Sequence, residues 1–294
     1  MKCFYHHDSD GKCAGYWVNR LAVVTDEYQD KTFVKIDYKD KFPLEMIRKN
    51  EQVFIVDYSI PPPLMLELLM ITKNVTWIDH HKTAIEKYGD FEHELRGLRY
   101  VGYSGAMLTY CYLKHMTDGG TGEVFDFDTR MTERAPLFTI LIDDWDVWRL
   151  QYGSMTKDFQ LGFNSYNFEP TSDEWKKFSG NTNSYEHKLI EEGIIINRYR
   201  AEWAKNYMVY GFELEFEGKK TFAINLGLCN SEYFKSLETS YDMLMPFVYD
   251  GKKFNVSLYS TKIDVSKIAK KYGGGGHAGA SGFQCKKLPF KTNF

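Results

Sequence analysis

The first half of the chain alternates between short apolar runs and longer segments with apolar positions every three or four residues. Such runs predict strands, and the three-to-four spacing predicts helices. The expected strands are 2–5, 32–36, 53–57 and 75–78, and the expected helices are 15–24, 64–71, 106–115 and one beginning at 136. Alternating elements of this kind predict an α/β fold, a mostly parallel sheet with flanking helices. Ligands of such sheets bind beyond the carboxyl ends of the strands.

The pattern changes after residue 150. Residues 153–184 are rich in Ser, Thr, Asn and Asp, which indicates a loop region, and 185–207 has a long helical pattern. Strand pairs are then expected at 212–216 with 221–225 and at 247–250 with 254–259, before a helix at 265–271. The sequence therefore predicts an N-terminal domain at 1–165, a loop and connecting helix at 166–207, and a smaller α+β domain at 208–294.

Composition narrows the class of protein. The 294 residues are 43% hydrophobic and 16% aromatic, enough for the cores of two domains. The net charge of −3 argues against a dominant positive field for long nucleic acids, although a local basic groove is compatible with it. We expect a cytoplasmic protein, because the five cysteines are dispersed and the first residues are polar. We also expect no membrane span, because no apolar run approaches the roughly 20 residues that a span needs.

Three of the apolar runs end in Asp or His. The first is followed by His6, Asp8 and Asp10, which would share one direction if the segment stays extended. An Asx turn at 8–11 is the alternative interpretation. The third is followed by Asp79, His80 and His81. Adjacent histidines face different ways, so one can bind a metal while the other meets substrate, unless both are solvated imidazoles at a helix cap.

Two further positions extend this chemistry. Asp57 follows the second of these runs, where a cap or turn residue is the alternative, and Asp143, Asp144 and Asp146 lie beside two tryptophans. Carboxylates in an apolar setting need partners, and a cation cluster would supply them, as would helix capping with solvent exposure. Carboxylates with imidazoles suit Mn²⁺ or Mg²⁺. Two such ions roughly 3.5–4 Å apart would activate water against a phosphate ester.

These segments together resemble a known family. Residues 6–11, Asp57, 79–81 and 144–148, in this order, resemble the four motifs of the DHH phosphoesterases, and 273–282 resembles the C-terminal signature of the DHHA1 domain. The resemblance covers both halves of the chain and leaves only 150–207 unmatched. The family comprises manganese-dependent phosphodiesterases and phosphatases. It includes RecJ-type exonucleases, nanoRNases, phosphatases of 3'-phosphoadenosine 5'-phosphate and cyclic dinucleotide phosphodiesterases.

The resemblance implies a set of site residues. Two Mn²⁺ ions, with Mg²⁺ as the alternative, would be held by His6, Asp8, Asp10, Asp57, His80 and Asp144. Asp57 would bridge both ions, and His81 would meet the substrate or its leaving group. Asp143 is the rival of Asp144. His6 departs from the spacing of members whose first histidine lies four residues before the aspartate pair, because position 4 is Phe.

The glycine run is the second part of the implied site. Its bare backbone would let phosphate approach N–H groups, with the substrate bound by Gly274, Gly275, Gly276, His277 and Ser281. A helix C-cap with a flexible turn is the alternative. In the family this loop faces the metal site across a cleft between the two domains.

The function expected from these observations is manganese-dependent hydrolysis of short oligonucleotides, as in nanoRNases, with 3'-phosphoadenosine 5'-phosphate as a further substrate. The length leaves little room for extra nucleic-acid-binding domains, and the mild acidity agrees with short substrates. Alternatives are a single-strand exonuclease, a cyclic dinucleotide phosphodiesterase and, from another class, a non-catalytic nucleotide-binding protein. The expected partner is a nucleotide or short oligonucleotide, with no membrane, and a homodimer stays open.

Overall fold

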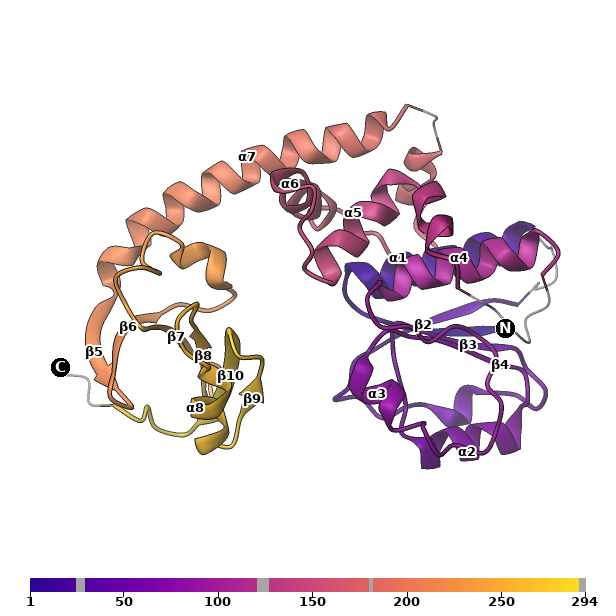
Figure 1. Ribbon diagram of the computed structural model, residues 1–294, viewed down its shortest axis with the longest axis horizontal. Helices are drawn as coiled ribbons and strands as arrows, with labels where there is room; N and C mark the ends of the chain where they lie inside the picture. Colours follow the sequence, from indigo (N-terminus) through magenta and orange to yellow (C-terminus); the bar gives the residue numbers. More distant parts are fainter. Residues whose placement is uncertain (25–29, 121–126, 180–181, 291–294) are drawn as a thin grey trace. The chain divides into compact units, whose positions relative to one another are not determined.

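The computed structural model describes residues 1–24, 30–120, 127–179 and 182–290, and the chain divides into two compact units, Met1–Ile196 and Asn197–Phe294 (Figure 1). The first unit contains a parallel four-stranded sheet with the order β2-β1-β3-β4. Its strands are β1 (Lys2–His6), β2 (Thr32–Ile36), β3 (Val53–Val56) and β4 (Val75–Ile78). The predicted α/β class is confirmed.

Helices cover both faces of this sheet (Figure 1). On one side lie α1 (Ser9–Val24), α4 (Gly105–Thr117) and α5 (Leu137–Asp146); on the other lie α2 (Pro62–Ile71) and α3 (Lys82–Glu86). Successive residues of β1 enter different cores: Cys3 and Tyr5 pack with α1 and α4, and Phe4 packs with α2. Because β3 and β4 are buried at every position, they read as nearly continuous apolar runs rather than alternating ones, whereas the edge strand β2 is only partly buried.

The region expected as a loop at 153–184 instead contains the helix α6 (Ser154–Phe163) and the 3₁₀ helix η3 (Asp173–Phe178). Helix α6 crosses α7 (Ser184–Tyr207) at backbone contact, since a β-carbon on Gly162 would lie 2.0 Å from the carbonyl oxygen of Leu189. The loop prediction was wrong because α6 buries polar side chains, among them Thr156 and Gln160, and these hide its buried face in the sequence.

The second unit contains a mixed six-stranded sheet with the order β5-β6-β7-β8-β10-β9. Its strands are β5 (Phe212–Phe216), β6 (Lys219–Asn225), β7 (Met243–Tyr249), β8 (Phe254–Tyr259), β9 (Gly275–Gly276) and β10 (Ala280–Cys285). Both predicted antiparallel pairs, β5 with β6 and β7 with β8, are present. Helix α8 (Val265–Lys271) packs its apolar side chains into the core of this unit.

The boundary between the units falls inside α7, between Ile196 and Asn197, and so lies within the predicted connecting segment 166–207. Within the described ranges, none of the helices combines the length and apolar character that crossing a lipid bilayer demands. The expected active-site cleft between the two domains stays a prediction.

Candidate metal centre

The carboxyl ends of β1, β3 and β4 bring the polar residues of the first unit together. His6 ends β1, Asp57 follows β3, and Asp79 follows β4. The N–H group of Asp57 donates to the carbonyl of Ile78 at 3.0 Å, and its φ of 50° lies in the left-handed region. A non-glycine residue with this backbone conformation is strained and occurs preferentially at functional positions.

The first group of potential ligands contains His6, Asp8 and Asp57. The Nδ1 atom of His6 lies 2.7 Å from Oδ2 of Asp8 and 3.8 Å from Oδ2 of Asp57. The second oxygen of Asp8 accepts a hydrogen bond from the N–H group of Gly11 at 2.9 Å. Two carboxylates and one imidazole thus face a common point next to the end of β1.

The second group contains Asp10, His80 and Asp146. The Nε2 atom of His80 lies 3.7 Å from Asp10 and 3.4 Å from Asp146, and it also lies 3.1 Å from Oδ1 of Asp57. The two oxygens of Asp57 therefore face different groups, Oδ2 the first and Oδ1 the second. This is the geometry expected of a carboxylate that bridges two cations.

Asp10 reaches the site by a route that its sequence pattern does not indicate. It lies in the first turn of α1 rather than in an extended segment, so the argument from alternating side-chain directions was wrong. Its carboxylate is buried and accepts hydrogen bonds from the N–H groups of Gly105 and Ala106, at 2.7 and 2.8 Å. The first turn of α4, with its positive end of the helix dipole, thereby stabilises a buried negative charge.

The three aspartates of the fourth motif have different surroundings in the structure. The carboxylate of Asp144 points away from His80: it accepts from the N–H group of Gln151 at 2.9 Å and from the hydroxyl of Thr156. Asp143, its rival, accepts from the N–H group of Ser104 and pairs with Arg149. Asp146 is the aspartate of α5 that faces His80, because positions 144 and 146 lie roughly 200° apart around a helix.

Crowded carboxylates change the acidity of the site. Burial, together with the charges of Asp10 and Asp8, raises the pKa of Asp57 well above its usual range and raises the pKa of Asp146 to about 9. Burial lowers the pKa of His80, although Asp10 opposes this effect. The carboxylates of the site repel one another when ionised, and, within the described residues, no lysine or arginine in the group compensates them. A bound divalent cation would supply the missing positive charge.

Unpartnered atoms identify where cations fit. Oδ2 of Asp57 and Oδ2 of Asp146 are both buried and, among the described residues, accept no hydrogen bond. A buried carboxylate oxygen without a partner is costly, and a divalent cation relieves this penalty. The donor set of carboxylates and imidazoles, without a thiolate, suits Mn²⁺ or Mg²⁺. Of the predicted ligands, the structure assembles His6, Asp8, Asp10, Asp57 and His80, and it places Asp146 where Asp144 was expected.

His81 differs from its neighbour in environment. Its Nδ1 atom lies 2.7 Å from Oδ1 of Asp79, which also accepts from the backbone N–H groups of both histidines. Burial lowers the pKa of His81, but the hydrogen bond and charge of Asp79 outweigh it, so the pKa is raised. The side chain is 36% exposed, and Nε2 is the ring nitrogen that this bond leaves free. His81 is therefore suited to donate a proton.

The predicted glycine loop forms a hairpin in the second unit. After α8, Gly275 and Gly276 pair with Gly282 and Ser281 of β10. The backbone at Gly276 has a φ of 135°, which a side chain rarely adopts. The N–H group of His277 donates to Ala280, and the buried hydroxyl of Ser281 donates to His277, so both groups are used within the turn. Substrate binding by Gly274, Gly275, Gly276, His277 and Ser281 stays a prediction.

Several residues of the site have no signal in the sequence. Gly105 approaches Asp57, and Ser104 and Arg149 contact Asp143. These contacts join segments of the chain that local sequence patterns do not connect. Asp79, which orients His81, does have a sequence signal, because it immediately precedes the two histidines.

Comparisons with known proteins agree with this fold. No family model matches the chain. The chain is 27% identical over 260 residues to the protein Uncharacterized protein R106 of Acanthamoeba polyphaga mimivirus; the match covers 82% of this chain and spans about half, 55%, of that relative. The solved structure of exonuclease RecJ bound to manganese matches with a TM-score of 0.51 and 13% identity, over 97% of this chain and 85% of RecJ.

A second solved structure, the pGpG-specific phosphodiesterase PggH from Vibrio cholerae, has a TM-score of 0.43 and 14% identity, over 97% of this chain and 92% of PggH. At such identities the likeness concerns the fold. The chain has the two-domain α/β fold seen in RecJ.

Proposed function

We propose that this protein is a divalent-metal-dependent phosphoesterase of the DHH superfamily that hydrolyses short oligonucleotides. The observation that carries the proposal is Asp57, whose two oxygens face separate acid–histidine groups 3.1 and 3.8 Å away. The shared fold of RecJ and the order of the sequence motifs support it. A phosphoesterase needs such paired sites because phosphoryl transfer depends on neutralising charge at several oxygens.

The residues divide between two cations. His6, Asp8 and Asp57 would hold one, and Asp10, Asp57, His80 and Asp146 would hold the other. When bound, the cations supply Lewis acidity toward the phosphoryl oxygens and make water acidic enough to act as a nucleophile. We propose manganese, with magnesium as the alternative, because the donor set suits both and the RecJ structure was solved with manganese.

The chain's own residues orient and move protons. The left-handed backbone of Asp57 directs its carboxylate between the two groups, and the first turn of α4 fixes Asp10. His81, held by Asp79, whose contact raises the pKa of the imidazole, would protonate the leaving oxygen through Nε2. Asp57 and His81 are thus the residues that we expect to contribute most directly to turnover.

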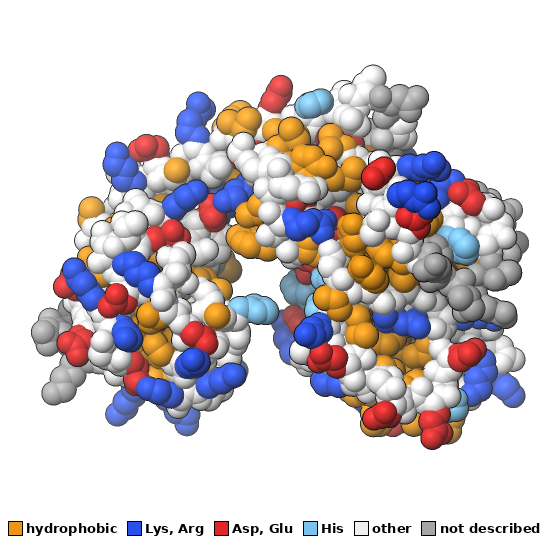
Figure 2. Space-filling view, viewed as in Figure 1, with side chains coloured by type: hydrophobic (Ala, Val, Ile, Leu, Met, Phe, Trp, Pro, Cys, Tyr) orange, Lys and Arg blue, Asp and Glu red, His pale blue; other side chains and the backbone are white. Residues whose placement is uncertain are grey.

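Short substrates are proposed on grounds of charge. The net charge is −3, and on the face seen in Figure 2 basic and acidic side chains are interspersed over the surface. Binding of long nucleic acids rests on many neutralised phosphates, which such a surface does not provide. The tight hairpin at Gly275 and Gly276, whose tip residues are exposed, is proposed to contact the terminal nucleotide.

The test is a comparison of turnover with Mn²⁺ across a dinucleotide, a pentanucleotide, a long single strand, cyclic dinucleotides and 3'-phosphoadenosine 5'-phosphate. We expect the dinucleotide and pentanucleotide to be hydrolysed fastest, with no activity after chelation and at least about 100-fold less in D57N. Fastest turnover of the long strand would contradict the short-substrate proposal. Binding of nucleotides without turnover of any phosphoester would contradict the enzymatic proposal as a whole.

A further inference from the structure

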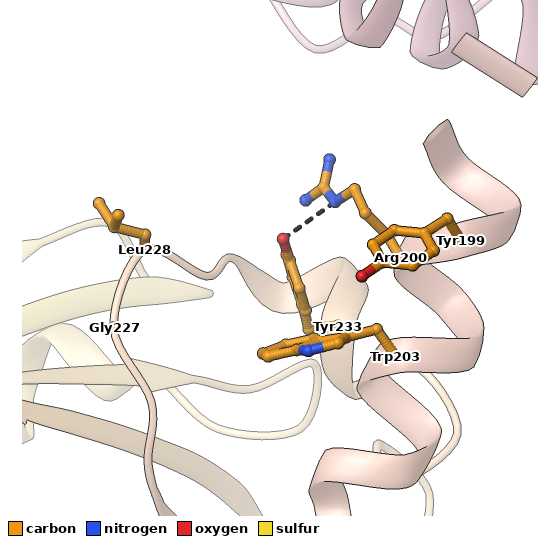
Figure 3. Close-up of a pocket in the computed structure, with 6 residues that line it drawn as sticks. All are labelled: Tyr199, Arg200, Trp203, Gly227, Leu228 and Tyr233. Atoms are coloured by element: carbon orange, nitrogen blue, oxygen red, sulfur yellow. Dashed lines mark hydrogen bonds between the residues drawn. The ribbon is translucent and has the colours of Figure 1, made fainter. Parts of the chain in front are cut away.

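A cavity of about 270 Å³ lies wholly within the second unit, away from the glycine hairpin in the sequence (Figure 3). Its wall on α7 consists of Tyr199, Arg200 and Trp203, which the helical repeat places on one face. Tyr233 of the 3₁₀ helix η5 (Ser231–Phe234) and the segment Gly227–Leu228 complete it. Three aromatic rings and one guanidinium thus line an open pocket with room for one small ligand.

Two of the aromatic rings that line the pocket, those of Trp203 and Tyr233, are held by contacts with other rings. Trp203 stacks on Tyr207 at 4.8 Å between ring centroids and meets the ring of Tyr233 at an angle of 87°. Tyr199, in contrast, is 70% exposed. Rings fixed by such contacts lose little freedom when a flat ligand stacks on them, and aromatic side chains in this arrangement are platforms for nucleobases.

Arg200 supplies the complementary charge. Its Nε atom donates to the hydroxyl of Tyr233 at 2.9 Å, and its guanidinium carbon lies 4.5 Å from the centre of that ring. This hydrogen bond orients the group but uses only one of its donors. Within the described residues Arg200 forms no ion pair, so its outer nitrogens face the opening as donors for an anion. A guanidinium binds phosphate in a two-pronged geometry that an ammonium group does not match.

Leu228 lies at the rim of the pocket. Its side chain is fully exposed, and its φ of 53° lies in the left-handed region, where a leucine is strained. In Figure 3 this side chain points away from the rings of Trp203 and Tyr233, so it does not cover the space beside them.

We infer that this pocket binds one nucleotide, with the base against Trp203 and Tyr199 and the phosphate on Arg200. This second site goes beyond the proposed function and does not depend on it. It belongs to the second unit alone, and no metal ligand contributes to it. A nucleotide satisfies both features of the cavity, its flat aromatic walls and its unpaired positive charge.

The test measures binding of AMP, adenosine and ribose 5-phosphate by calorimetry in the presence of EDTA, so that the metal centre does not contribute. We expect AMP to bind at least about tenfold more tightly than either fragment, because stacking and the phosphate contact act together. W203A and R200Q are expected to lose at least about tenfold in AMP affinity. Y249A, which removes an exposed aromatic ring of the same unit outside the cavity, is the matched control and should bind as the wild type does.

The variant R200Q separates binding from folding. It removes the charge and leaves the rings of Tyr199, Trp203 and Tyr233 in place, so the Tm should stay near that of the wild type while AMP affinity falls. Absence of AMP binding by the wild-type chain at millimolar concentration would overturn the inference. That result is expected if the pocket receives a side chain of a partner protein instead of a nucleotide. Equal affinity for AMP and ribose 5-phosphate, with no effect of W203A, would overturn it too. Since no metal is present, these outcomes are independent of whether the protein hydrolyses phosphoesters.

Discussion

A β-carbon on residue 105 would lie 2.5 Å from Cβ of Asp57 and 2.9 Å from its Cα atom, so Gly105 allows the first turn of α4 to touch the strand end that carries Asp57. The N–H group of the same glycine donates to Asp10 at 2.7 Å. One residue without a side chain thus sets the separation of two carboxylates.

The variant G105A tests this relationship. An added methyl group must displace either α4 or Asp57, which is expected to lower the free energy of unfolding by about 1–3 kcal/mol. Mn²⁺ affinity, measured by calorimetry, should fall with it. G89A is the matched control, because its β-carbon would meet nothing nearer than 3.4 Å. Unchanged Mn²⁺ affinity in G105A would contradict the role assigned to the contact.

The variant D57N tests the bridging carboxylate. Asparagine tolerates the left-handed backbone, so the change removes charge with little added strain. We expect turnover to fall at least about 100-fold, since replacing even a residue that only orients a metal ligand costs about 10–100-fold. Without metal, the free energy of unfolding should not fall, because one of several repelling carboxylates is gone. D118N, which alters an exposed carboxylate paired with Lys114, should retain turnover. Full activity of D57N would refute the bridge.

The pair D144N and D146N separates folding from metal binding. Asp144 accepts from Gln151 and Thr156 inside the protein, so D144N is expected to lower the free energy of unfolding by about 1–3 kcal/mol. Asp146 faces His80 with an unpartnered oxygen, so D146N should weaken Mn²⁺ binding and leave the metal-free Tm unchanged or higher. Denaturant unfolding and calorimetry on both variants give the comparison. The reversed pattern would restore Asp144 as the ligand.

Metal binding should release protons near neutral pH. Burial and the neighbouring carboxylates raise the pKa of Asp146 from the ordinary 3.8 of an aspartate to about 9 in the metal-free fold, so this carboxyl is protonated at pH 7 and must ionise to bind a cation. Mn²⁺ affinity therefore rises with pH. Because the folded pKa is raised, the contribution to metal-free stability is present below about pH 4 and is lost as pH rises through about 9. Calorimetry in buffers of different ionisation enthalpy counts the protons, and D146N should release fewer.

Glu169 predicts the opposite pH dependence. It accepts from the hydroxyl of Tyr5 at 2.5 Å and lies 3.6 and 3.5 Å from the ammonium groups of Lys12 and Lys35. Burial opposes ionisation, but Tyr5 and the lysines outweigh it and lower the pKa. Its stabilising effect is therefore present above about pH 4.5 and is lost as pH falls.

The variant E169Q should lower the free energy of unfolding by about 1 kcal/mol at pH 7, with the difference from the wild type vanishing in acid. Urea unfolding at several pH values measures this. E213Q, which alters an exposed pair with Lys220, should show no such pH dependence. A difference that persists in acid would point to packing rather than charge.

Much of the fold follows from the sequence because its strands are short, mostly apolar runs. The ranges 32–36 and 75–78 match β2 and β4, which are apolar except for Thr32, Lys35 and Thr76 and are too short for a helical interpretation. Helix α6 escaped prediction, since its buried positions include Thr156 and Gln160, whose partners lie elsewhere in the chain. Patterns of single residues do not reveal a polar side chain that is buried because a distant segment satisfies it.

The site divides along the same line. Residues at strand ends, among them His6, Asp57 and His80, are brought together as the parallel sheet requires. Asp10 and Asp146 depend instead on where helices begin and end: α1 begins at Ser9, and α5 ends at Asp146. Helix ends are set by tertiary contacts, such as the close approach of Gly11 to the backbone of His6. The spacing of the motif does not contain this information, and it therefore favoured Asp144.

The backbone contact at Gly105 also bears on how such a protein diverges. Main-chain atoms, rather than the shapes of core side chains, set how closely α4 approaches the end of β3. Leucines, valines and phenylalanines beneath the site are then free to be exchanged for one another over generations, provided that their total volume is kept. A lineage built in this way can lose nearly all recognisable similarity and still hold its acidic groups at the same spacing.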